Sequence, residues 1–241
     1  MIESIEEDCL RQILKTGQKC PISIIYLETS QLPARFHIWR MMAIYLHYLL
    51  QQKPNSLLHK FFNAQQNNPI RGDWISNMKR ILTIIEIKLS FTDIKNMKKR
   101  VFMKKVDNNI KSYAFKYLQN KIKSKGKEIV YDGIWRCQDY LMPNDILSFE
   151  EQTSIFSYRS RTNKIDNNFS KNHNIDNANC RCGAQLMNEH IYSCLILNER
   201  RQLNIPYKRI FNGSLHDMKK IVNIMNENMK KLKSLSQAQD I

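Results

Sequence analysis

Apolar residues recur along most of this chain at the three- and four-residue spacing of an amphipathic helix. Residues 1–16 fit a short helix of this kind, whereas the apolar run over residues 22–27 fits either a strand or a buried turn of helix. The most hydrophobic predicted helix covers residues 33–52, with Pro33 at its first helical position. Its apolar positions occupy more than one stripe, which predicts a central, buried helix.

Further helices are expected downstream, and several of them begin with a capping residue. They cover residues 56–66, 74–87, 92–124 (with or without one break), 148–161, 187–202 and 215–233. Asp73 is placed to cap the second of these helices. The pairs Ser90–Asp93 and Ser148–Glu151 have the spacing of capping boxes, in which each side chain bonds the backbone of the other.

The segments between these helices are short or polar. One more turn of helix is expected over residues 134–142, and the Asn-rich stretch over residues 166–179 predicts an irregular connector. The whole 241-residue chain holds six Gly and six Pro, which argues against an all-β architecture because tight turns depend on these residues. Hydrophobic residues make up 42% of the chain, enough for a buried core.

The net charge of the chain indicates which classes of partner it can bind. The formal net charge is +16, which favours an anionic partner such as nucleic acid or an acidic membrane surface. A second explanation is compositional, since AT-rich codons add Lys, Asn and Ile without selection for binding. No apolar run reaches the roughly 18–20 residues that cross a bilayer, and residues 1–8 are too acidic for a signal or transit peptide. We therefore expect no membrane association and an intracellular protein of the nucleus or cytoplasm.

The basic residues concentrate in one segment. Residues 95–127 contain twelve Lys or Arg and a single acid, Asp107. We expect phosphate contacts from this cluster, and a weaker second group at Arg159 and Arg161. The cluster proper consists of Lys98, Lys99, Arg100, Lys104 and Lys105.

Four aromatic residues are interleaved with these cations, namely Phe102, Tyr113, Phe115 and Tyr117. Such rings can stack on unpaired bases, but on an amphipathic helix each of them is more often part of the core. We expect the core for each ring.

One group of Cys and His residues has the spacing of metal ligands. Cys180, Cys182, His190 and Cys194 have the spacing C-x-C-x7-H-x3-C, and three thiolates with one imidazole satisfy a tetrahedral Zn²⁺ ion. His190 and Cys194 are four apart on a predicted helix, so both project from one face. With four protein ligands the site would be closed and structural, holding one zinc. The alternatives are a chance cluster of buried cysteines beside a histidine, or His173 competing as a ligand.

The residues around this motif resemble the C-terminal region of non-LTR (LINE-like) retrotransposon reverse transcriptases. The specific part is FSYRSRTNKIDNNFSKNHNIDNANCRCGAQLMNEHIYSC, residues 156–194, which has an Arg-Ser-Arg segment, an Asn-Phe, a C-x-C-G turn, Glu-His and a final Cys. Residues 21–50 and 56–74 are also similar to this family in pattern. The resemblance implies thumb and linker over residues 1–150 and a zinc knuckle over residues 176–204, with the ligand role at the four motif residues.

The catalytic motifs of that family are absent from this sequence. It has no Asp-Asp pair for a polymerase and no Pro-Asp for the nuclease of some relatives. We therefore expect no enzyme activity from this chain, which reads as a fragment, a degraded element or a separately encoded module.

Together these patterns predict a mainly α fold: an irregular helical bundle, a small Cys3His zinc-knuckle module and a C-terminal helix. The expected segments are residues 1–147, 148–205 and 206–241. The expected function is RNA or DNA binding through phosphates, as the template- and primer-positioning part of a reverse transcriptase. The alternative is an adaptor that binds a protein through the Met-rich face of its last helix. The sequence leaves the oligomeric state open.

Overall fold

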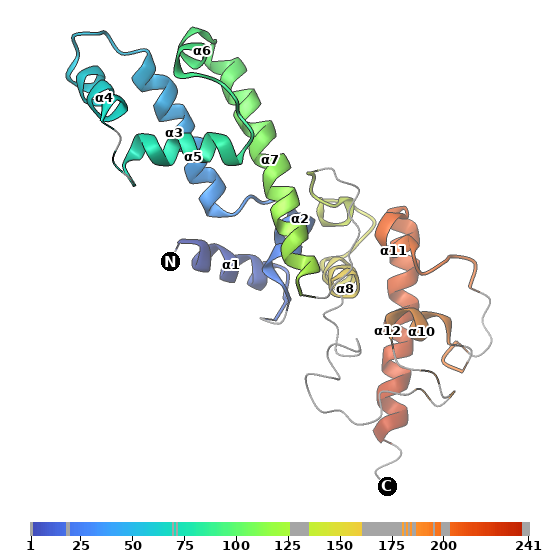
Figure 1. Cartoon of the computed structure of the whole chain (residues 1–241). Coiled ribbons are helices and arrows are strands. Elements are labelled where there is room, and N and C mark those ends of the chain that lie inside the picture. The colour runs from blue at the N-terminus through green and yellow to red at the C-terminus, as the bar shows by residue number, and fades with distance from the viewer. Residues whose placement is uncertain are drawn as a thin grey trace. The chain divides into compact units, whose positions relative to one another are not determined.

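The structure of the chain is a computed structural model that describes most of its residues (Figure 1). The described residues are 2–17, 20–68, 70, 72–125, 135–160, 180, 182, 184, 187–194, 196–198 and 203–237. Within these ranges the chain forms α-helices and one short 3-10 turn, and no strand. The predicted mainly α fold is thus confirmed. Residues 22–27, which fitted strand or helix, belong to a helix.

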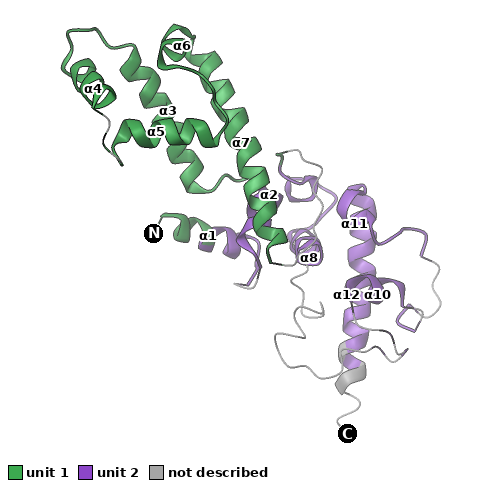
Figure 2. Cartoon of the chain, viewed as in Figure 1, with its two compact units in different colours: residues 1–7, 30–136 green, residues 8–29, 137–241 purple. Residues whose placement is uncertain are grey.

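The described chain divides into two compact units (Figure 2). Unit 1 comprises residues 1–7 and 30–136, and unit 2 comprises residues 8–29 and 137–241. Helix α1 (Ile2–Ile13) contributes to both. This division does not follow the expected segments, because residues 8–29 group with the C-terminal part of the chain rather than with the residues that follow them.

Unit 1 is a bundle built around two long helices. Its helices are α3 (Ala34–Leu50), α4 (Leu57–Asn67), α5 (Trp74–Ile84), α6 (Phe91–Asn96) and α7 (Lys99–Lys123). Helix α3 is the centre, because it contacts α4, α5, α6 and α7. The predicted 92–124 helix is broken at Met97 and Lys98, which have extended backbones between α6 and α7.

The helix starts agree with the capping residues read from the sequence. The Asp73 side chain accepts a hydrogen bond from the backbone N–H of Ser76. Ser90 with Asp93 forms a complete capping box, as does Ser148 with Glu151 in unit 2.

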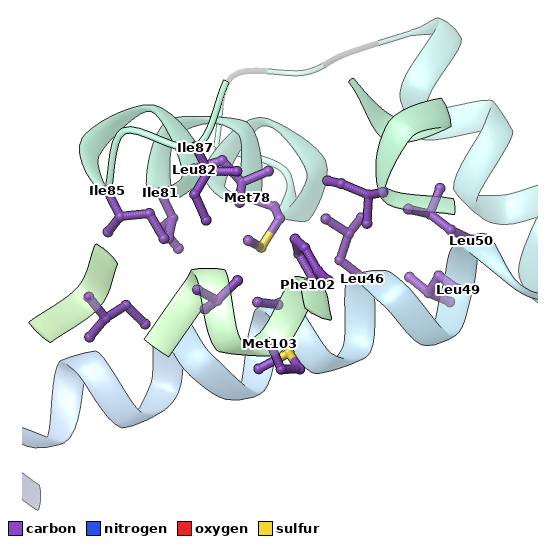
Figure 3. Close-up of a cluster of buried hydrophobic side chains, with 14 of the residues drawn as sticks. Leu46, Leu49, Leu50, Met78, Ile81, Leu82, Ile85, Ile87, Phe102 and Met103 are labelled. Atoms are coloured by element: carbon purple, nitrogen blue, oxygen red, sulfur yellow. The ribbon is translucent and has the colours of Figure 1, made fainter. Parts of the chain in front are cut away.

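The core of unit 1 lies between α3, α5 and α7. Figure 3 shows Leu46 of α3, Met78 of α5 and Phe102 of α7 pointing into the same interior, and each has essentially no exposed surface. The expectation of a central, buried α3 is only half met. One face is core, but Ile38 and Met41 on the other face are 51% and 60% exposed.

Unit 2 consists of several short helices, a 3-10 turn and one long C-terminal helix. They are α2 (Ile22–Thr29), the 3-10 turn η1 (Asp139–Leu141), α8 (Phe149–Arg159), α10 (Asn188–Ser193), α11 (Arg209–Asn212) and α12 (Leu215–Gln237). Helix α12 contacts α8, α10 and α11. Helix α10 ends earlier than the predicted 187–202 helix, because Cys194 has an extended backbone.

Candidate metal centre and basic helix

The four motif residues come together in unit 2. Their ligand atoms all lie within 4.8 Å of one another. The Cys180 and Cys194 sulfur atoms are 3.6 Å apart, and the Cys182 sulfur is 3.3 Å from His190 Nε2. A sulfur separation of 3.6 Å is far longer than the roughly 2.05 Å of a disulfide. This Cys3His group can therefore hold a metal ion, and it fits a small zinc-knuckle-like module.

Local backbone structure supplies the ligands in pairs. The Cys180 N–H donates to the Ala184 carbonyl at 2.8 Å, which closes a turn around Cys182. His190 lies on α10 and Cys194 caps its C-terminus, where the Cys194 N–H donates to the His190 carbonyl at 2.7 Å. One helical turn therefore brings the second pair of ligands to the same side.

The two described cysteines of the turn differ in environment. Burial raises the pKa of the Cys180 thiol to about 11. A hydrogen bond from the Ala184 backbone lowers the pKa of Cys182, which is exposed. A bound cation would convert both thiols to thiolates, since metal binding deprotonates a coordinating thiol.

Two buried asparagine side chains, hydrogen-bonded to one another, hold the backbone around the candidate metal centre. Asn198 donates to the carbonyls of Cys194 and Tyr192 at 2.8 and 2.7 Å. Asn228 of α12 in turn donates to Ile191 and to the Asn198 side-chain oxygen, at 2.8 and 3.1 Å. Such partners fix the orientation of metal ligands. Sequence reasoning missed both residues, although an Asn within the apolar stripe of the last helix was a usable signal.

Helix α12 also covers the centre with apolar side chains. Cys180, Ile191, Cys194 and Leu197 form a small buried cluster, against which Met229 and Leu232 pack. Nearer the start of α12, Met218 and Met225 are 6% and 0% exposed. The Met-rich face is therefore an internal packing surface of unit 2.

The predicted cationic cluster lies at the start of α7 in unit 1. All its members have exposed side chains, and Lys98 is the N-cap residue. The one acid of the segment, Asp107, is paired with Arg40, whose Nε is 2.8 Å from a carboxylate oxygen. The cations therefore keep their excess charge on the surface of unit 1.

Arg159 has a different role from the predicted phosphate contact. It is 3% exposed, and its Nε lies 3.1 Å from a carboxylate oxygen of Glu28, which is fully buried. Its Nη1 donates to the carbonyls of Ile210 and Phe211, at 2.9 and 2.7 Å. The prediction for Arg159 is thus corrected, because every edge of the guanidinium is used inside unit 2. Arg161 and the spare ligand candidate His173 lie outside the described residues.

The aromatic residues of α7 mostly follow the expectation of a core role. Phe102 is buried, while Tyr113 and Tyr117 are half-buried and pack against the core of unit 1. Phe115 is half-buried but does not belong to that core.

Among the helices of the described residues, none combines the length and the apolar character that crossing a membrane requires. No family model, curated protein or solved structure matches this chain.

Proposed function

We propose that this chain binds nucleic acid as the C-terminal, non-catalytic part of a retrotransposon-type reverse transcriptase, with one structural zinc ion in unit 2. The observation that carries this proposal is the Cys3His group. Its spacing and flanking residues resemble those of the C-terminal region of non-LTR retrotransposon reverse transcriptases. The exposed cations of α7 supply the surface for phosphates.

The donor set and its spacing favour zinc. Three thiols and one imidazole are soft and borderline ligands, which suit zinc better than magnesium or calcium. With Zn–S bonds of about 2.3 Å, two sulfurs of a tetrahedron are about 3.8 Å apart. The Cys180–Cys194 separation of 3.6 Å is close to this value.

The position of the α7 cations supports an anionic ligand. Lys98, Lys99 and Arg100 occupy the N-cap and first two positions of a 25-residue helix, where the backbone already presents partial positive charge. Like charges at this end repel, and phosphate groups would relieve that repulsion. Lys104 and Lys105, one turn further, extend the same positive surface.

Metal analysis tests the zinc centre. We expect about one zinc per chain in the purified protein, and loss of that zinc in Cys180→Ser and His190→Ala, because each removes one of four ligands. The matched controls are Cys9→Ser and His37→Ala, which change an exposed thiol and an exposed imidazole outside the cluster. One zinc per chain in both ligand variants would show that the assignment is wrong.

Salt titration tests the nucleic-acid surface. We expect the affinity for a labelled duplex to fall steeply with salt, since each neutralised phosphate contributes about 0.9 to the log–log slope. The test variant replaces four lysines of α7 by Gln: Lys98, Lys99, Lys104 and Lys105. The control variant replaces four exposed cations elsewhere in unit 1: Lys53, Lys60, Arg80 and Lys88.

Both variants have the same net charge, so a difference between them reports position rather than total charge. We expect the slope to fall by roughly 2 to 4 in the α7 variant and by less than 1 in the control. An affinity that does not change between low and moderate salt would contradict the proposal. An equal fall of the slope in the two variants would also contradict it.

A further inference from the structure

An open groove of about 480 Å³ runs along the outer face of α7, entirely within unit 1. Its walls combine two aromatic rings, two lysines and three hydrogen-bonding side chains. The lining residues are Asn108, Lys111, Ser112, Phe115, Lys116, Gln119 and Trp135. Its volume is within the roughly 300–1,000 Å³ typical of ligand sites.

The helical register makes this groove a continuation of the cationic cluster. Lys104, Asn108, Lys111 and Phe115 are spaced by four, three and four residues, so they follow one face of α7. Lys105 stands seven residues before Ser112 and therefore shares that face. Lys104 and Lys105 of the cationic cluster and the groove thus form one strip along the helix.

Phe115 is the aromatic residue of α7 that does not belong to the core cluster of unit 1 described above. Tyr113 and Tyr117 pack on Phe36, with ring centroids 6.1 and 6.2 Å away. Phe115 is half-buried, lines the groove and is absent from the core cluster that includes the other three rings. Its ring therefore borders a space that the side chains of the described residues do not fill.

Trp135 supplies a second, fixed ring. Its indole Nε1 donates to the Ser30 carbonyl at 3.1 Å, and its body packs against the core of unit 1. A ring held in this way loses little freedom when a flat ligand stacks on it. Pre-ordering of this kind lowers the cost of binding.

The charge around the groove is positive. Lys111 and Lys116 are both exposed. The Lys116 ammonium is 4.0 Å from a Glu86 carboxylate oxygen, but the two side chains are 67% and 76% exposed, and such a pair is weak. Lysine beside aromatic rings is the combination that binds single strands, where the rings stack on bases and the lysines meet phosphates.

We infer that this groove binds a single-stranded segment of nucleic acid, with an unpaired base against Phe115 and Trp135 and the flanking phosphates on Lys111 and Lys116. Asn108, Ser112 and Gln119 can hydrogen-bond the edge of that base. The inference rests on the proposed nucleic-acid binding and adds two things to it: where the strand lies, and why an unpaired strand is preferred to a duplex. A duplex keeps its bases stacked on one another and cannot offer a free face to the two rings.

The test compares Phe115→Leu with Phe61→Leu in the full chain. Phe61 is 63% exposed on α4, so it controls for the loss of a surface ring in the same unit. Binding is measured by fluorescence anisotropy on a labelled 12-nucleotide single strand and on a duplex of the same length at one salt concentration. Thermal unfolding of both variants checks that unit 1 remains folded.

We expect Phe115→Leu to weaken single-strand binding roughly 5- to 100-fold, the loss of one stacked base, and to change duplex binding less than about twofold. Phe61→Leu leaves both affinities unchanged, and Phe115→Trp restores the single-strand affinity. Equal loss on both nucleic acids, or no loss on either, overturns the assignment of the groove while the salt-dependent binding of the parent chain still stands.

Two further outcomes separate the possibilities. If the parent chain binds neither nucleic acid, the proposed function and this inference fail together. If adenosine monophosphate alone binds in a manner that Phe115→Leu abolishes while the single strand does not bind, the occupant is a free nucleotide and the inference of a strand is overturned.

Discussion

At the scale of single residues, the ion pair between Arg159 and Glu28 shows that one guanidinium can join several helices. Its Nη2 bonds Glu28 and Gln138 at 3.1 and 3.2 Å, in addition to the backbone carbonyls on Nη1. The Tyr140 hydroxyl donates to the same carboxylate at 2.8 Å. One buried charge pair thereby connects α2, α8, η1 and α11 within unit 2.

Removal of one member of this pair is expected to destabilise unit 2 strongly. Arg159→Met leaves the Glu28 carboxylate buried without its cation, which costs about 3–5 kcal/mol of unfolding free energy. The double variant Glu28→Leu with Arg159→Met should recover a large part, because no unpaired charge remains. Urea unfolding followed by circular dichroism measures both, with the exposed Arg209→Met of α11 as control. A loss below about 1 kcal/mol in Arg159→Met would contradict the role assigned to the pair.

The sequence predicted single residues well where their partners are near in the chain. The metal ligands lie within 15 positions, so spacing alone brings Cys180 and Cys194 together. Arg159 was misread because its partner is 131 positions away. No local pattern distinguishes an Arg that meets a phosphate from one that meets a distant carboxylate.

At the scale of elements, α3 begins in an unusual way. Its N-cap is Pro33, whose side chain makes no capping bond. Instead the Ala34 and Arg35 N–H groups donate to carboxylate oxygens of Glu6 and Glu3 on α1, at 3.0 and 3.2 Å. Two acids from another helix thus stabilise the positive end of α3.

This arrangement predicts a pH dependence for Glu3. A hydrogen bond from Arg35 holds the pKa of the Glu3 carboxyl below its ordinary value. A lowered folded-state pKa stabilises the fold above the unfolded pKa of about 4.3, and this contribution is lost as pH falls through the folded value. Both side chains are about a third exposed or more, which keeps the contribution below about 1 kcal/mol.

Chemical unfolding of the parent chain and Glu3→Gln at several pH values checks this. We expect a small stability deficit for Glu3→Gln at pH 7 that disappears near pH 3. A deficit that grows as the pH is lowered would have the opposite sign from the mechanism described.

Elements were predictable where their signals are local. The caps at Asp73, Ser90 and Ser148 act within three residues, and all were identified from sequence. The exposure of one face of α3 was not, because its apolar residues on that face, such as Ile38 and Met41, read like core. Periodicity records hydrophobicity and carries no information about which face another helix covers.

At the scale of the whole molecule, two clusters of buried side chains lie in different units. The core of unit 1 is formed by α3, α5 and α7 and their neighbours, whereas the metal-centre cluster lies against α12 in unit 2. The sequence suggested consecutive segments, but residues 8–29 belong with residues 137–241. Long-range grouping of this kind depends on which surfaces fit, and composition does not reveal it.

The position of the metal-centre cluster in unit 2 predicts a selective response to metal removal. Because ion binding and folding are coupled in small metal centres, a chelator should loosen α10 and the end of α12. Amide hydrogen exchange should therefore rise in those segments while Leu46 and Phe102, in the core of unit 1, keep their protection. Restored protection on adding back zinc is the control. Uniform loss of protection through α3 and α7 would mean that the two units do not respond separately.

The interleaved order of the two units also has a consequence for synthesis on the ribosome. Most of unit 1, residues 30–136, is encoded between the two parts of unit 2, so unit 1 has been made in full before residue 137 emerges. Glu28 must wait 131 residues for Arg159, roughly 7 to 26 s at about 5–20 residues per second. During this interval the nascent chain carries an apolar helix α2 without the surfaces that later bury it. A ribosome-associated holdase that binds this early segment would therefore act on unit 2 while unit 1 is already folding.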